Sequence, residues 1–305
     1  MTILSPVLLF MLLCITSAKL NKNGNSSPLY EIENELKFPE FSKPYTYIFL
    51  RLYDVEYSSA LNPTNILKLG ITCTEVADIR VSHASINFSL DDNFYALSAG
   101  GKYQVARESC MNTDSNKFMK KSNPETSNQI TFALKVYEQE YYDTKKFVEE
   151  YAKNPDIKYD VLQNFKIAKF ATKRKFFTDP EQQAFGEVKY PEKNGLRVYL
   201  QEHLRDHLHG HIPEELEISE AGLSDDEAKE FVCSTFVAYS LIKNIGWLNK
   251  WFEDNKIDYN YVTVSDLSSI PGVVKLFSSK FYEYDEAVGL FLEKHPEFKE
   301  YYSQK

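Results

Sequence analysis

The sequence has no excess of positive charge and no long apolar run, and each absence excludes a class of protein. Its 35 Lys and Arg residues are outnumbered by 44 Asp and Glu residues, which gives a formal net charge of -9. Sequence-independent binding to nucleic acid needs a basic surface that neutralises phosphates, so we predict no nucleic-acid partner. The apolar run from Val7 to Ile15 is far shorter than the roughly 20 residues of a membrane-spanning helix, so we predict no transmembrane span in the mature chain.

Two motifs that carry cofactor or metal chemistry are also missing. The chain has no phosphate-binding glycine loop and no His-Glu-x-x-His zinc motif. We therefore predict no cofactor and no catalytic metal. One histidine cluster, from His203 to His211, places His203 and His207 four residues apart, with His209 nearby. It is either a solvated loop or a structural or adventitious metal site.

The N-terminus is typical of an exported protein. Residues 1–18 combine the apolar run with a small-residue ending, Thr16-Ser17-Ala18, and resemble a signal peptide that lacks the usual basic start. A lipoprotein signal that uses Cys14 is the alternative. We expect a secreted or periplasmic location.

Cysteine counting then leaves an odd number of thiols. Removal of residues 1–18 leaves Cys73, Cys110 and Cys233, so at least one thiol is unpaired. The sequence does not decide between two states of these thiols. In one, Cys73 and Cys110 form a disulfide; in the other, all three cysteines are reduced.

The rest of the chain is organised as one domain. Residues 19–44 are polar and are predicted to be a linker, and residues 45–305 are predicted to form the domain, with an insertion at about 178–223 that is rich in Gly and Pro. Aromatic and β-branched runs predict strands, and charged periodic runs predict helices. The expected strands are residues 45–55, 81–88, 94–99 and 129–137, and the expected helices are residues 142–153 and about 285–305.

Two of these elements carry chemistry. Alternation in the strand at 81–88 places His83 on its more polar face. Ser224 to Glu227 has the form of a capping box, which predicts a helix that starts there and carries Cys233 in its third turn. A thiol that far into a helix gains little from the helix dipole, so either the helix is broken near Phe231 or the case for a nucleophile weakens. Taken alone, Cys233 fits a buried core residue as well as a nucleophile.

Several short segments together resemble a known superfamily. They are Tyr47-Ile48-Phe49-Leu50, Val81-Ser82-His83-Ala84-Ser85-Ile86, Tyr95-Ala96-Leu97-Ser98-Ala99-Gly100, Lys158-Tyr159, Phe231-Val232-Cys233-Ser234-Thr235-Phe236 and Val262-Thr263-Val264-Ser265-Asp266-Leu267. Their order is similar to that of the circularly permuted papain-like, NlpC/P60-type cysteine hydrolases, most of all uncharacterised bacterial members. In that group the histidine strand precedes the cysteine helix.

The resemblance implies both a fold and a function. The fold would be α+β, with an antiparallel sheet packed on the cysteine-bearing helix. Cys233 would be the nucleophile, His83 the general base and Ser98 the residue that orients the histidine. The superfamily uses a polar third residue from the next strand. Here residues 94–99 offer only Tyr95 and Ser98, with no Asp, Glu, Asn or Gln, and Ser98 is the choice.

The substrate classes that the resemblance implies are a peptide or an acyl group. An amide bond of a cell-wall peptide is the first expectation, cleaved through an acyl-enzyme. An acyl-lipid hydrolase or acyltransferase of the same fold is one alternative. A non-catalytic binding or structural protein that keeps the fold is the other, because the third residue is weak.

Overall fold

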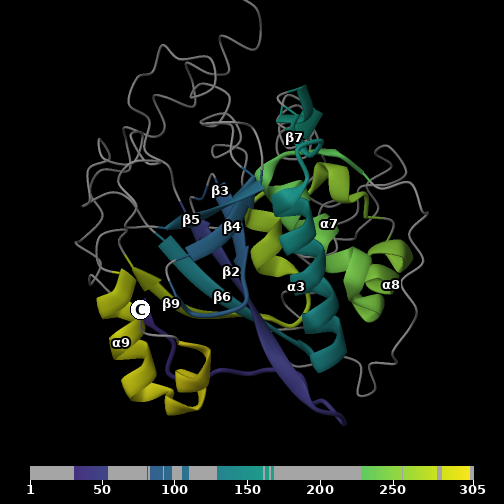
Figure 1. The fold of residues 1–305 in the computed structure, drawn as a ribbon. Helices are drawn as coiled ribbons and strands as arrows, with labels where there is room; N and C mark the ends of the chain where they lie inside the picture. The colour runs from purple at the N-terminus through teal and green to yellow at the C-terminus, as the bar shows by residue number, and fades with distance from the viewer. Residues whose placement is uncertain are drawn as a thin grey trace, which may run out of the picture.

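A computed structural model of the chain describes residues 31–53, 81, 83–91, 93–97, 105–109, 129–160, 162–164, 166–167, 228–255, 257–279 and 284–302. A large antiparallel sheet with helices on both faces makes up most of this part, and a short parallel pair of strands lies at one end (Figure 1). The protein is therefore of the α+β class, as predicted.

Seven strands form the large sheet. They are β1 (Glu31–Ile32), β2 (Tyr45–Tyr53), β3 (His83–Asn87), β4 (Asn93–Leu97), β5 (Val105–Ser109), β6 (Gln129–Tyr137) and β9 (Val273–Ser279). Their order in the sheet is β1-β9-β6-β2-β3-β4-β5. The strands predicted at 45–55, 81–88, 94–99 and 129–137 are confirmed as β2, β3, β4 and β6. Strands β2 and β6 pair along their whole length, and their aromatic and β-branched residues suit this central position.

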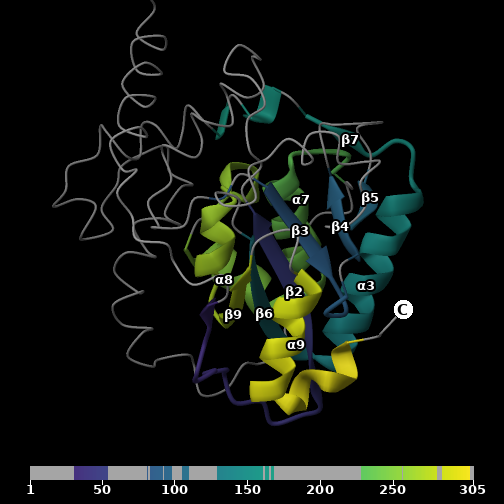
Figure 2. The same cartoon turned by 90° about the vertical axis from the view of Figure 1, so that its left-hand side faces the viewer.

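Different helices cover the two faces of the sheet. They are α3 (Glu138–Lys153), α7 (Cys233–Asn244), α8 (Gly246–Asp254), α9 (Tyr284–Lys294) and the 3₁₀ helix η5 (Pro296–Tyr301). Alternate residues of β2, such as Leu50 and Leu52, are fully buried in one cluster with residues of α3, α7 and α8. The intervening Phe49 belongs to a second cluster with α9 and η5, and Figure 2 shows α9 and α7 on opposite sides of the sheet. Each fully buried Leu or Phe contributes about 1.5–3 kcal/mol, so both clusters hold their helices firmly on the sheet.

The first turn of α3 contains a buried carboxylate. Its residue, Glu140, accepts a hydrogen bond from the backbone N–H of Tyr137 at 3.1 Å. This bond caps the helix, which explains why α3 begins at residue 138 rather than at the predicted residue 142. Burial raises the pKa of Glu140 to about 7, although N–H groups of Tyr137, Trp247 and Gly246 favour its ionised form. The hydrogen bond from Tyr137 therefore ties this carboxylate to the start of α3.

The chain before β2 belongs to the folded domain from residue 31 onward, which corrects the predicted linker at residues 19–44. Strand β1 pairs with β9. The ring of Phe38 lies 5.0 Å from that of Tyr47, and the carbonyl of Pro39 accepts a hydrogen bond from Lys135 at 3.0 Å. Strand β9 and Lys135 are distant from this segment in sequence, so its polar composition does not reveal them as partners.

The C-terminal helix is shorter than predicted. Helix α9 ends at Lys294, and Pro296 begins η5. A proline has no N–H group to donate to the preceding turn and its ring clashes with that turn, so the expected helix to residue 305 cannot continue through it. In the part of the chain that the structure describes, no helix combines the length and the apolar character needed to cross a membrane.

The small sheet pairs two short strands in parallel. Strand β7 (Lys158–Tyr159) follows α3, and β8 (Glu230–Phe231) precedes α7. The predicted signal peptide at residues 1–18 and the predicted insertion at about 178–223 lie outside the described residues.

Candidate active site

Cys233 is the first residue of α7, which corrects the prediction that its helix starts at Ser224. Residues 230–231 are a strand, and Val232 has an extended backbone with φ of -102° and ψ of 174°. The hydroxyl of Thr235 accepts a hydrogen bond from the N–H of Val232 at 2.9 Å and so caps the new helix start. The pairing of β8 with β7 therefore decides where this helix begins, against the local signal at Ser224.

The first turn of α7 is buried and held in place. The side chain of Cys233 is 6% exposed. The hydroxyl of the next residue, Ser234, donates a hydrogen bond to the carbonyl of Val262 at 2.7 Å. The start of a helix carries partial positive charge from N–H groups that lack intrahelical partners, and this charge stabilises a thiolate. The predicted third-turn position of Cys233 would have given a nucleophile little help from the helix dipole. Its observed position in the first turn removes that conflict.

Tyr159 is a neighbour of Cys233 that the sequence did not identify as a site residue. It pairs with Phe231 in the small sheet, and its hydroxyl accepts a hydrogen bond from the side-chain amide of Asn164 at 2.8 Å. Burial, and then the negative charge of a Cys233 thiolate, raise the pKa of Tyr159. The phenol thus keeps its proton at neutral pH and is a potential donor beside the thiol. Its only signal in the sequence is its place in the family-like order of motifs.

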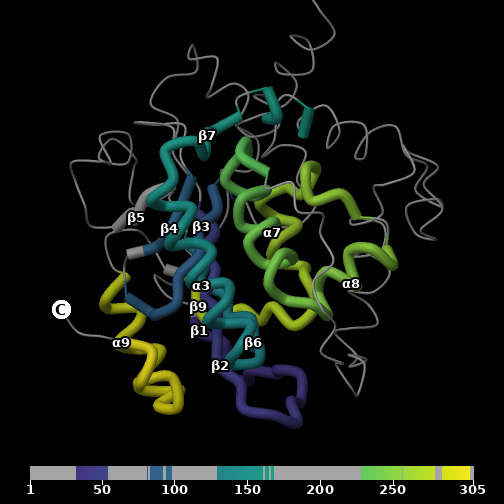
Figure 3. The backbone as a smooth tube through the Cα atoms, turned by 45° about the vertical axis from the view of Figure 1, so that its right-hand side comes forward, coloured from purple at the N-terminus to yellow at the C-terminus, as the bar shows by residue number. Residues whose placement is uncertain are grey.

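His83 is the first residue of β3, and it is buried. Strand β3 packs against α7, and both elements begin toward the end of the molecule where β7 lies (Figures 1 and 3). His83 pairs with Tyr53 of β2, and the two rings meet edge to face with centroids 4.8 Å apart. The next residues on the other face of β3, Ala84 and Ile86, belong to the cluster that contains Cys233. The contact between β3 and α7 is a finding, whereas the pairing of the thiol with the imidazole stays a prediction.

Several predicted site residues lie outside the described residues. They are Ser98, the cysteines Cys14, Cys73 and Cys110, and the histidine cluster from His203 to His211. Within the described residues, Cys233 is not paired in a disulfide. Within the described ranges, no group of three or more His, Cys, Asp or Glu side chains is placed to hold a metal ion.

Comparisons with known proteins add no relative. Searches of protein-family models, of curated proteins and of solved structures found no match to the chain.

Proposed function

We propose that the protein is an exported cysteine hydrolase with a circularly permuted papain-like, NlpC/P60-type fold. The observation that carries this proposal is the position of Cys233 at the first residue of α7, with the histidine-bearing strand β3 packed against that helix. A nucleophilic thiol at a helix start, next to a sheet that carries a histidine, is the arrangement that activates cysteine in papain-like enzymes.

The proposed reaction proceeds in two steps through an acyl-enzyme. His83 takes the proton of the Cys233 thiol, and the thiolate sulfur attacks the carbonyl carbon of the substrate. The tetrahedral intermediate collapses when its C–N bond breaks, and the imidazolium of His83 gives its proton to the departing amine. Water, activated by the same imidazole, then adds to the thioester and releases the acid and the free thiol.

Two sets of donors are available to the oxyanion of the tetrahedral intermediate. The backbone N–H groups at the start of α7 are one set. The phenol of Tyr159, which keeps its proton and lies near Cys233, is the other. Ser98 would orient the imidazole of His83, in the position where the superfamily has a polar residue.

The first substrate class is a cell-wall peptide, cleaved at an amide bond outside the cytoplasm. The predicted signal peptide at residues 1–18 supports this choice, because the cell wall is reached only by export. An acyl lipid is the alternative substrate, since its ester carbonyl reacts with a thiolate in the same way.

A non-catalytic role is a second candidate, and one observation favours it. The alternation of β3 groups His83 with Tyr53, whereas Ala84 and Ile86 face the cluster that contains Cys233. A histidine that only packs against Tyr53 would leave the thiol without a base, and the protein would then bind rather than cleave.

Trapping of the acyl-enzyme tests the proposal. Purified protein would be incubated with cell-wall peptides and, separately, with acyl lipids, quenched in acid, and analysed by mass spectrometry of the peptide that contains Cys233. We expect an acyl adduct on Cys233 that accumulates in wild type and is absent in Cys233→Ala. Failure of both substrate classes to leave an adduct, with Cys233 intact, would support the binding role instead.

A further inference from the structure

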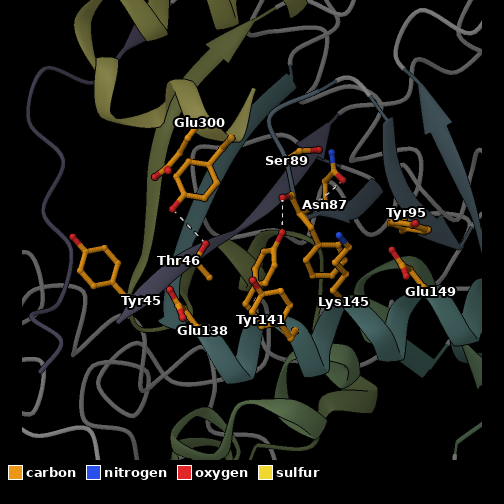
Figure 4. A pocket seen from close by; sticks show the side chains of 13 residues that line it. Tyr45, Thr46, Asn87, Ser89, Tyr95, Glu138, Tyr141, Lys145, Glu149 and Glu300 are labelled. Atoms are coloured by element: carbon orange, nitrogen blue, oxygen red, sulfur yellow. Dashed lines mark hydrogen bonds between the residues drawn. The ribbon is translucent and has the colours of Figure 1, made fainter. Parts of the chain in front are cut away.

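A cavity lies at the opposite end of the sheet from Cys233. Its volume is about 550 Å³, and it is lined by Thr46 near the start of β2, by Asn87 at the end of β3, by side chains of α3 and by the end of η5 (Figure 4). Strand β3 runs from His83, near the candidate active site, to Asn87 in this cavity. The two sites are therefore separate, and the cavity falls within the range of about 300–1,000 Å³ that small-molecule sites occupy.

The charges around this cavity favour a cation. Three carboxylates, those of Glu138, Glu149 and Glu300, and one ammonium group, that of Lys145, line it. Among the described residues, none of these four groups forms an ion pair with another side chain. The ammonium of Lys135 lies over the ring of Tyr45, which also lines the cavity, so three negative charges and two positive charges leave a net charge of -1. The whole chain has the same sign, with a formal charge of -9. An anionic ligand would be repelled, and a cationic one attracted.

Tyrosine rings supply the second half of the site. Five tyrosines line the cavity, and two of them, Tyr45 and Tyr142, are 44% and 61% exposed. The ammonium of Lys135 already lies over the ring of Tyr45, 3.7 Å from its centroid, so Tyr142 is the exposed ring that a ligand can reach. Two others are fixed: the hydroxyl of Tyr141 donates to the carbonyl of Phe88 at 2.9 Å, and the hydroxyl of Tyr301 accepts from Thr46 at 3.3 Å. The face of an aromatic ring attracts an ammonium group through its quadrupole.

We propose that this cavity binds an organic cation, a small molecule that carries a primary or quaternary ammonium group. The cation would sit between Glu138 and Glu300, because Lys145 lies toward one end of the cavity, near Glu149, and Lys135 covers the ring of Tyr45 at the other end (Figure 4). Rings and carboxylates act together there, since the rings cover the carbon atoms next to the nitrogen and the carboxylates neutralise its charge.

Calorimetric titration of the full chain with two cations, choline and cadaverine, tests the proposal. Maltose, as a neutral polyol, and acetate, as an anion, serve as comparison ligands. We expect at least one cation to bind, with an affinity that falls as sodium chloride is added, and we expect neither maltose nor acetate to bind. Binding of maltose without either cation, or no heat from either cation at low salt, would overturn the proposal.

Charge-neutralising variants locate the site. Glu138→Gln and Glu300→Gln should each weaken cation binding by about fivefold, the scale of one exposed ion pair or cation–π contact. Glu150→Gln removes one charge from an exposed position of the same helix outside the cavity, and Cys233→Ala removes the proposed nucleophile, so both should bind like wild type. Equal affinity of wild type, Glu138→Gln and Glu300→Gln would place the cation elsewhere and contradict the proposal.

Discussion

Tyr159 pairs with Phe231 two residues before Cys233, and its hydroxyl accepts a hydrogen bond from Asn164 at 2.8 Å. A two-residue strand pair thus brings a protonated phenol close enough to Cys233 for the charges of the two groups to interact, from a segment more than 70 residues away in sequence. If Tyr159 donates to the oxyanion, its removal should slow acylation and leave the fold unchanged.

The variant Tyr159→Phe keeps the ring and removes only the hydroxyl. We expect the acylation of Cys233 by p-nitrophenyl acetate to slow by about a hundredfold, the usual effect of losing one oxyanion donor. The burst of p-nitrophenol measures this rate. Asn164→Ala leaves the phenol in place and should have a smaller effect. A burst rate in Tyr159→Phe equal to that of wild type would remove Tyr159 from the mechanism.

Glu140 should make the stability of the protein depend on pH. Its pKa is about 7 in the folded protein against an ordinary value of 4.5, and burial is the main cause. The folded state therefore holds the proton more tightly than the unfolded chain. This contribution to stability is complete below pH 4.5 and is lost as the pH rises through 7, with a total change of about 3 kcal/mol.

The variant Glu140→Gln removes this titration and can still accept the hydrogen bond from Tyr137. Urea unfolding at pH 5 and at pH 8 should show a smaller loss of stability in the variant than in wild type. Glu150→Gln, at an exposed position of the same helix, should follow wild type. The same fall in unfolding free energy in wild type and Glu140→Gln would show that Glu140 is not the group responsible.

Ser234 anchors the first turn of α7 through its bond to the carbonyl of Val262. Ser234→Ala leaves that carbonyl buried without the hydroxyl, so we expect a loss of about 1–3 kcal/mol in the free energy of unfolding. Ser240→Ala is the matched control, because its hydroxyl bonds to Phe236 within the same helix. The carbonyl of Phe236 can also accept the ordinary helical hydrogen bond from a backbone N–H four residues later. The control should therefore lose less unfolding free energy. Equal losses in the two variants would contradict the anchoring role.

Removal of metal ions should leave the proposed reaction unchanged, since a thiolate and an imidazole carry out every step. Burst kinetics with p-nitrophenyl acetate should be the same before and after dialysis against EDTA. Activity that disappears in EDTA and returns with Zn²⁺ would instead direct attention to the histidines between His203 and His211.

The sequence predicts the central strands well and the start of the cysteine helix poorly. In β2 and β6, local preference and tertiary position agree, since aromatic and β-branched residues lie in the middle of the sheet. At Ser224 to Glu227 the local capping signal competes with the pairing of β8 with β7, which depends on residues 158–159. No local pattern contains that partner, so the sequence alone left open whether a break near Phe231 separates Cys233 from the capping signal.

Two further differences have the same physical origin. The segment from residue 31 to residue 44 is polar in composition, but β9 and the ring of Tyr47 hold it in the fold. The role of Tyr159 depends on its distance from Cys233 in space, which only the folded chain defines. The assignment of Cys233 and His83 as a pair rests on a resemblance in sequence order, and it needs a chemical test.

The pH dependence of alkylation of Cys233 by iodoacetamide is that test. Peptide mapping would separate Cys233 from the other cysteines, and the rate would be measured from pH 5 to pH 9 in wild type and in His83→Ala. We predict that wild-type Cys233 reacts as a thiolate well below pH 8, and that in His83→Ala the rate rises only near pH 8.5, the ordinary range of a free thiol, with at least about a tenfold loss at pH 6. Superimposable profiles for wild type and His83→Ala would contradict the pairing of Cys233 with His83.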